Sequence, residues 1–117
     1  MGKLTTHVLD TSAGKPGTGI RISLFHLTDN AKNLIKSSVT NTDGRTDAPL
    51  LEDATFDIGH YELVFHVGSY FDRAGLSLPA PKFLDEVVIR FGIADMDQHY
   101  HVPLLISPYG YSTYRGS

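Results

Sequence analysis

Closely spaced turn signals constrain this chain more than any other feature of its sequence. Six stretches rich in Gly, Pro, Asn, Asp or other turn-forming residues break it into short pieces: DTSAGKPGTG, NTDG, APLLED, DIGH, LPAPK and DMDQ. The pieces between them alternate apolar and polar residues or are rich in β-branched and aromatic residues, which is typical of strands. Many short strands at such spacing predict an all-β sandwich or barrel.

We therefore expect a series of strands and one helix within a single domain of residues 1–117. The strands are predicted at Leu4–Asp10, Ile20–Leu27, Leu34–Asn41, Ala54–Asp57, Tyr61–Val67, Glu86–Ala94, His99–Ser107 and Tyr111–Arg115. The stretch GSYFDRAGL has a different character, because Ser69 can cap a helix and Gly75 can end one. A short helix is predicted there.

The composition excludes several classes of protein. Hydrophobic residues make up 41% of the chain, which is enough for a packed core and argues against disorder. The net charge of −3 argues against a nucleic-acid or anionic-membrane surface, because such surfaces need an excess of basic residues. The lack of Cys excludes disulfides and zinc–thiolate sites.

The sequence also bears on location. No apolar run reaches the roughly 18 residues that a transmembrane helix needs. The N-terminal stretch MGKLTTHVLDT lacks the apolar segment of a secretory signal. A cytoplasmic location is therefore expected, with a periplasmic one if a signal peptide was removed and a peroxisomal one in a eukaryote.

Three predicted strands carry a second face that is apolar or amphipathic rather than charged. In HYHVPLLIS, one face is an apolar core set of Tyr100, Val102, Leu104 and Ile106. The opposite face holds His99, His101, Pro103 and Leu105. In the first predicted strand, Leu4 and Val8 can join the core, which leaves Thr5, His7 and Leu9 on the opposite face. In the last predicted strand, one face is formed by Gly110, Ser112 and Tyr114. We favour contact with another copy of the chain over the alternative that loops cover these strands.

Six histidines are the main candidates for chemistry, because the chain has no thiol nucleophile and none of the common catalytic or nucleotide-binding motifs. His99 and His101 have a spacing that can bind zinc from one strand, but the sequence supplies no convincing third and fourth ligand. His7 and His101 differ from three of the others because both lie on the second face. The remaining three are expected to be structural: His26, His60 and His66.

The C-terminal end, SPYGYSTYRGS, is rich in tyrosine although chain ends are usually plain and mobile. Together with TTHVLDTSAGKPGTG, TNTDGR and HYHVP, this end resembles the 5-hydroxyisourate hydrolase family, transthyretin-related enzymes of purine catabolism. The resemblance runs from Thr5 to Ser117, and the terminal YRGS is its most specific motif. The KPGTG loop varies slightly from many relatives, which have Ala after the Pro.

The resemblance implies a transthyretin-like sandwich of two four-stranded sheets with one short helix. It implies a homotetramer with active sites at the dimer–dimer interface, a small-molecule substrate, 5-hydroxyisourate, and neither cofactor nor metal. No nucleic-acid or membrane partner is expected. The family's catalytic positions fall on His7, Arg45 and His101. Without the resemblance, Arg45 would be interpreted as a solvated charge that follows the turn NTDG. The implied substrate-binding residues are His99, Tyr114, Arg115 and Ser117, with Arg115 expected to fix the tail through an ion pair.

Three other functions compete with this interpretation. A transthyretin-like carrier would have a ligand channel between subunits but would need neither the His/His/Arg set nor YRGS. A structural or adhesion module would not need histidines on an interface face, although the fold alone allows it. A metal-dependent hydrolase would lose activity on treatment with a chelator, and no loss is expected.

Overall fold

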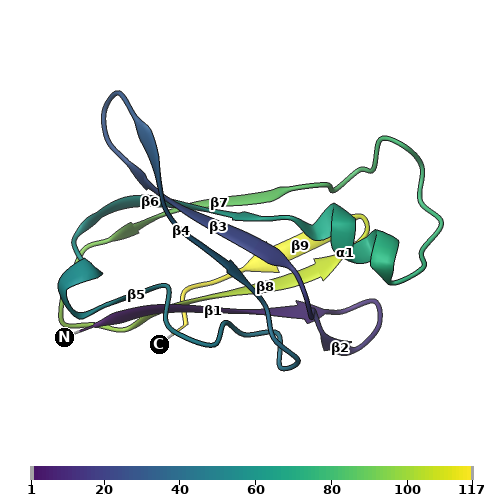
Figure 1. The fold of residues 1–117 in the computed structure, drawn as a ribbon, viewed down its shortest axis with the longest axis horizontal. Coiled ribbons are helices and arrows are strands. Elements are labelled where there is room, and N and C mark those ends of the chain that lie inside the picture. The colour runs from purple at the N-terminus through teal and green to yellow at the C-terminus, as the bar shows by residue number, and fades with distance from the viewer. Residues whose placement is uncertain (1, 117) are drawn as a thin grey trace.

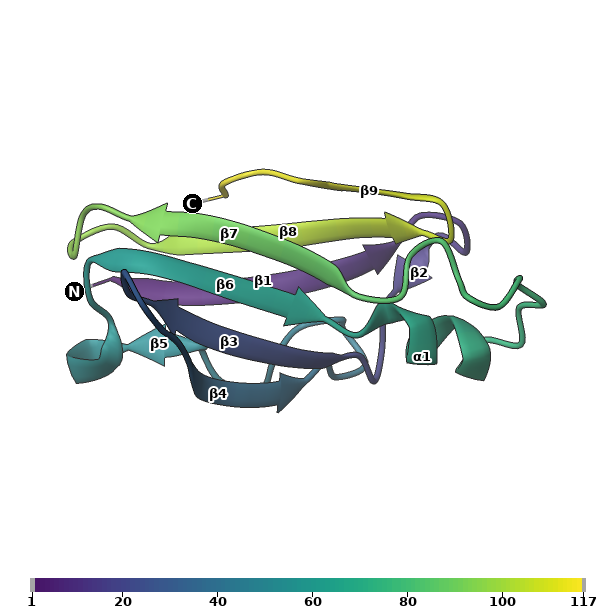
Figure 2. The ribbon, with the colours of Figure 1, turned by 90° about the horizontal axis from the view of Figure 1, so that it is seen from above.

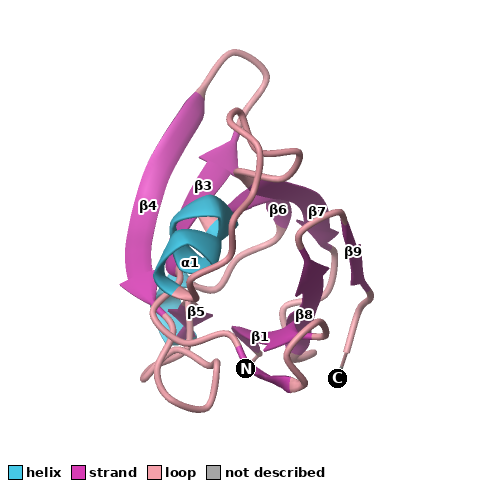
Figure 3. Ribbon diagram, turned by 90° about the vertical axis from the view of Figure 1, so that its right-hand side faces the viewer, coloured by secondary structure: helices cyan, strands magenta, loops and turns pink. Residues whose placement is uncertain are grey.

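The computed structural model describes residues 2–116 as two β-sheets packed face to face (Figure 1). The first sheet has the strand order β2-β1-β8-β9, with β5 also paired to β1. Its strands are β1 (Lys3–Asp10), β2 (Lys15–Pro16), β5 (Leu51–Glu52), β8 (Tyr100–Ser107) and β9 (Gly110–Thr113). The second sheet has the order β4-β3-β6-β7, formed by β3 (Arg21–Leu27), β4 (Lys32–Val39), β6 (Gly59–Phe65) and β7 (Val87–Ile93). The end-on view in Figure 3 shows the two layers, and the expected all-β sandwich is confirmed.

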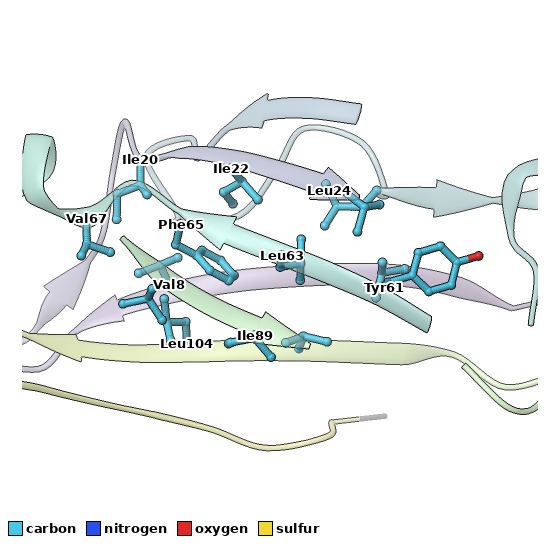
Figure 4. Packing of buried hydrophobic residues seen from close by; sticks show 14 of the residues in the cluster. Val8, Ile20, Ile22, Leu24, Tyr61, Leu63, Phe65, Val67, Ile89 and Leu104 are labelled. Carbon is cyan, nitrogen blue, oxygen red and sulfur yellow. The ribbon is translucent and has the colours of Figure 1, made fainter. Parts of the chain in front are cut away.

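The core lies between the inner faces of the two sheets (Figure 4). Val8 and Leu104 from the first sheet and Leu63 and Phe65 from the second are fully buried there. Each such side chain stabilises the fold by roughly 1.5–3 kcal/mol relative to an exposed position. The predicted inner set of residues 100–106 is confirmed, because alternate residues of β8 are buried.

The central pair of the first sheet joins the two ends of the chain. β1 and β8 run parallel, with Thr5 opposite His101 and His7 opposite Pro103. Because side chains alternate along a strand, burial of the inner set turns Thr5, His7 and His101 to the outer face together. After β9, the chain runs back along β8 toward the start of that strand (Figure 2).

One predicted strand is wrong, and the first sheet gains one short strand beyond the expected four. Residues Ala54–Asp57 do not form a strand, because the chain makes a 3-10 helix, η1 (Asp53–Thr55), at this point. The hydroxyl of Thr55 donates to the carbonyl of Glu52 at 2.7 Å and accepts from its N–H at 3.0 Å, so a side-chain turn replaces strand pairing. The first sheet has five strands rather than four, since β2 and β5 are two-residue strands that the turn-rich sequence concealed.

The predicted helix forms as α1 (Val67–Arg73), two residues before the expected cap. Ser69 lies inside it and His66 at its N-cap, because the carbonyl of Asp85 accepts from the N–H of Gly68 at 2.9 Å. A backbone group thus replaces a side-chain cap. Gly75, with φ of +80°, follows the helix end as predicted. No helix within residues 2–116 is long and apolar enough to cross a membrane.

Candidate active site

Two histidines that are 94 positions apart in the chain form a hydrogen-bonded pair on the outer face of the first sheet. Nδ1 of His7 lies 2.7 Å from Nε2 of His101. The two rings stack with their centroids 4.8 Å apart and their planes at 22°. Each side chain is half-buried. The structure therefore brings together two of the three predicted catalytic residues as one unit.

Thr5 is a third member of this arrangement. Its hydroxyl oxygen lies 2.8 Å from Nδ1 of His101, on the side of the ring away from His7. The strand register explains the contact, because Thr5 is directly opposite His101. Sequence reasoning put Thr5 on the same face as His7 but gave it no role. The signal that could have identified it was the TTH spacing, which points two polar side chains the same way.

Arg45 reaches the site through a tight turn that pairs with β1. The side-chain oxygen of Asn41 accepts from the N–H groups of Asp43 and Arg45 at 2.9 and 3.2 Å. Gly44 has a φ of +76° and accepts from the N–H of Val8 at 2.8 Å. Arg45 is then bridged to His7 on the edge of β1, between the short strands β2 and β5. The third predicted catalytic residue therefore lies beside the histidine pair.

Burial, and after it the charge of Arg45, keeps the two histidines of the site neutral. Burial lowers the pKa of His7 below its ordinary value of 6.5, and the nearby Arg45 guanidinium lowers it further. Burial lowers the pKa of His101, and His7 and Arg45 act in the same direction. Near pH 7 both imidazoles are therefore uncharged, and each carries one N–H and one lone pair. A neutral imidazole beside a guanidinium can remove a proton from water while the cation stabilises negative charge.

The C-terminal segment closes the site from the other edge of β8. The N–H of Gly116 donates to the carbonyl of His101 at 2.7 Å, and the N–H of His101 donates back at 3.3 Å. A Cβ atom at Gly116 would lie 3.2 Å from Cδ2 of the His101 ring. The end of the described chain therefore packs against the imidazole, a backbone contribution that sequence reasoning did not separate from the YRGS side chains.

Arg115 holds this segment in place by contacts with neutral groups, and its predicted ion pair stays a prediction. Its guanidinium donates to the side-chain oxygen of Gln98 and to the carbonyl of His99, both at 2.9 Å. It also lies 4.3 Å above the centre of the Tyr100 ring. Its partners within residues 2–116 are neutral oxygens and an aromatic face. Such a cation–π contact adds about 0.5–1 kcal/mol at an exposed site.

Two other predicted substrate-binding residues, His99 and Tyr114, are not hydrogen-bonded to the pair within residues 2–116. His99 is exposed, and its backbone carbonyl is the group that Arg115 engages. Tyr114 is exposed and lines a separate, mostly apolar hollow of about 300 Å³ between β7 and the tail. Ser117 lies outside the described residues. A small hollow of about 130 Å³ is lined by Thr5 and Arg45, the neighbours of the pair, but by neither histidine.

The described residues bear on two further expectations. Within residues 2–116, no group of three or more His, Cys, Asp or Glu side chains is arranged to hold a metal ion. On the outer face of the first sheet, Leu9 and Leu105 are half-buried and partly open to a neighbour. Pro103 is already buried within the single chain, since Thr113 of β9 hydrogen-bonds to its carbonyl at 2.7 Å. The second face is therefore partly apolar, as the sequence predicts, and partly covered by the chain itself.

The sequence matches a known family over nearly its whole length. The profile of the HIUase/Transthyretin family covers residues 4–116. The protein named 5-hydroxyisourate hydrolase 2 of Rhizobium meliloti is 62% identical over 116 residues, which are 99% of this chain and 97% of that protein. The 5-hydroxyisourate hydrolase of Ralstonia nicotianae is 59% identical over 117 residues, the full length of both.

Solved structures agree with this match. A crystal structure of (S)-allantoin synthase superposes with a TM-score of 0.94 and 46% identity; the match covers 99% of this chain but only 44% of that longer one. The 5-hydroxyisourate hydrolase of Klebsiella pneumoniae superposes with a TM-score of 0.80 and 37% identity over the full length of both. Sea bream transthyretin in complex with thyroxine, with 22% identity and a TM-score of 0.85 over 97% of this chain and 94% of that one, shares the fold.

Proposed function

The chain belongs to the HIUase/Transthyretin family, and we propose that it is a hydrolase that opens the six-membered ring of 5-hydroxyisourate. One observation carries the proposal: the hydrogen-bonded pair of His7 and His101 lies beside Arg45 on the outer face of the first sheet. The relatives of 62% and 59% identity, both named as hydrolases of this compound, support the substrate.

The reaction that we propose is the addition of water to an amide-type carbonyl. A C–O bond forms at the carbonyl carbon, the bond from that carbon to the ring nitrogen breaks, and the nitrogen leaves with a proton. The product is 2-oxo-4-hydroxy-4-carboxy-5-ureidoimidazoline. This chemistry needs a base for the water, a positive group for the developing oxyanion and an acid for the leaving nitrogen.

The histidine pair supplies the base and then the acid in this proposal. Both imidazoles are neutral near pH 7 because their pKa values are held below 6.5. The pair takes the proton from water and returns it to the leaving nitrogen, and such general acid–base catalysis contributes roughly 10²–10⁴-fold. Activity should therefore persist below pH 6.5, and should be lost only as acid protonates the pair.

Arg45 binds the substrate and stabilises the negative charge on its oxygen. A guanidinium presents parallel N–H donors that match carbonyl or enolate oxygens, and it stays charged at any working pH. The guanidinium lowers the pKa of His7, which supports a role for this charge near the point where water would lose its proton. The C-terminal residues complete the cleft, with Ser117 orienting the substrate or a histidine, Tyr114 on the wall and Arg115 fixing the segment.

We propose that the active form is a homotetramer with its sites at a dimer–dimer interface. The half-buried Leu9 and Leu105 beside the histidine pair support this assembly. A symmetric contact would cover the exposed part of both side chains on each of the two subunits. Light scattering at micromolar concentration checks it, and a stable monomer with full activity would contradict it. The cytoplasmic location expected from the sequence stays a prediction.

Ultraviolet spectroscopy on freshly generated 5-hydroxyisourate tests the function directly. The wild-type protein should speed the decay of substrate absorbance, and His101→Asn should lose most of that acceleration. His60→Asn is the matched control, because His60 is exposed at the start of β6 on the other sheet. A protein that binds the compound without speeding its decay would be a carrier, and the proposal would fail.

The same assay tests the expectation that no metal is needed. Extensive dialysis against EDTA or dipicolinate should leave turnover unchanged. Loss of turnover on dialysis, followed by recovery with zinc, would mean that a metal takes part and that the proposed roles of the histidines are wrong.

A further inference from the structure

The hydroxyl of Thr5 makes a contact that its neighbour on the same strand does not make. Thr6 faces the core, where its hydroxyl donates to the carbonyl of Val102 at 2.6 Å, an ordinary strand contact. The hydroxyl of Thr5 lies instead 2.8 Å from a ring nitrogen of His101. Thr5, His101 and His7 therefore form an unbroken row of polar groups, joined by contacts of 2.8 and 2.7 Å.

Counting protons along the row leaves two arrangements when both imidazoles are neutral. In the first, His101 donates from Nδ1 to the Thr5 oxygen, and His7 donates from Nδ1 to Nε2 of His101. In the second, the Thr5 hydroxyl donates to Nδ1 of His101, which donates from Nε2 to Nδ1 of His7. Any other combination puts two lone pairs or two N–H groups face to face across a contact. The state of His7 is therefore tied to Thr5, which does not touch it.

The open end of the row is Nε2 of His7, which has no hydrogen-bond partner within residues 2–116. In the first arrangement this nitrogen carries a lone pair and can accept a proton from water. In the second it carries a hydrogen and can donate. A hydroxyl is suited to the far end of such a row, because it both donates and accepts, whereas a valine of the same shape does neither.

We propose that Thr5 is a positioning residue: its hydroxyl, by holding Nδ1 of His101, fixes the orientation of that ring and, because the two rings change tautomer together, sets the balance between the two arrangements at His7. The inference rests on the proposed function for its catalytic consequence, since it makes Nε2 of His7 the atom that meets water. Thr5 does not react, and its effect reaches the substrate through two rings.

A direct contact between Thr5 and the substrate is the main alternative. Thr5 does line a small hollow together with Arg45. A lost substrate contact would raise KM and leave the rings of the free protein unchanged. A lost positioning contact would instead lower kcat with little change in KM, and it would alter the rings before substrate is added.

Nitrogen-15 NMR of the imidazole rings, recorded on the free protein near pH 7, tests the proposal without any substrate. Thr5→Val should move the ring-nitrogen shifts of both His101 and His7, which report the tautomer, and Thr5→Ser should restore both. Thr6→Val is the matched control, expected to lower the melting temperature and to leave the rings as in wild type. Unchanged shifts at His7 in the Thr5→Val protein would overturn the inference.

Kinetics on the same four proteins give the second readout. In Thr5→Val, kcat should fall roughly 10–100-fold, the loss seen when the partner that orients a metal-bound histidine is removed, while KM stays within about threefold. Circular dichroism verifies that each variant is folded. If the ring-nitrogen shifts change in Thr5→Val but the wild-type protein does not hydrolyse 5-hydroxyisourate, the proposed function is refuted and the effect of Thr5 on the rings is not. If the shifts stay unchanged in Thr5→Val and the wild-type protein is an active hydrolase, only the effect of Thr5 on the rings is refuted.

Discussion

Substitution of Gly44 by Ala should damage the site more than it damages the fold. Gly44 has a φ of +76°, a conformation that costs any residue with a Cβ atom about 1–2 kcal/mol. A Cβ atom built there would also lie 2.4 Å from the carbonyl oxygen of Val8. Ordinary contact begins at 3.4 Å, so the two atoms must separate by the difference, 1.0 Å.

That separation falls on the turn that carries Arg45. Gly44 is hydrogen-bonded to Val8 through its carbonyl, and the next residue, Arg45, is bridged to His7. A displacement of 1.0 Å therefore moves the guanidinium relative to the histidine pair. A misplacement of about 1 Å can cost roughly 10² in rate, so we expect the turnover of Gly44→Ala to fall about 100-fold.

Gly14→Ala is the matched control, because Gly14 has a φ of +66° but a Cβ atom there would meet nothing within 4 Å. It carries the same conformational cost without the clash, and should lower the melting temperature by several degrees while activity stays near that of wild type. The assays are decay of 5-hydroxyisourate absorbance and thermal unfolding followed by circular dichroism. If Gly44→Ala turned over within threefold of Gly14→Ala, the turn would not position Arg45 as we reason.

Three more perturbations test the site and the fold. Arg45→Lys should lower turnover by about 10²–10³-fold, because an ammonium lacks the paired donors, yet it keeps the charge, so the acid limb of the pH–rate profile should not move. Deleting residues 114–117 should leave a folded protein by circular dichroism but almost no hydrolysis, and a full rate would show that the tail is dispensable. Glu62 is buried, and its contacts with Lys32 and Arg90 at 2.7 and 2.8 Å hold its pKa below the ordinary value. The stability that it contributes is complete above the unfolded pKa of about 4.3 and is lost as the pH falls through the folded pKa. Acid unfolding curves of Glu62→Gln should therefore be flatter than those of wild type, and identical curves would contradict the assignment.

The turn residues and the alternation of side chains were enough to predict the architecture from the sequence alone. Closely spaced Gly, Pro and Asp residues predicted short strands, and the period of two in residues 99–107 predicted which side chains are buried. These features are local, so a single sequence contains them. The prediction of a strand at Ala54–Asp57 was wrong for a local reason too, because the Thr55 hydroxyl forms hydrogen bonds with the backbone of Glu52 in place of a neighbouring strand.

The composition of the site was also within reach of the sequence. The parity of the two strands set His7 and His101 apart from His26, His60 and His66, and the resemblance of the tail and the NTDGR turn added Arg45. Neither argument fixes a distance. A face assignment says only which side of a sheet a residue occupies, and not which residue of another strand lies opposite it.

Only the tertiary structure decided how these residues meet. The parallel register of β1 and β8 puts Thr5 opposite His101 and brings His7 to 2.7 Å from it, across 94 positions of sequence. The Gly44 turn then meets one edge of this pair of strands and Gly116 the other. Strand register between distant segments is set by how the whole core packs, since a slip of one residue would turn every buried side chain to the outside. No single stretch of the chain determines this register, and it is the register that brings His7 and His101 into hydrogen-bonding contact.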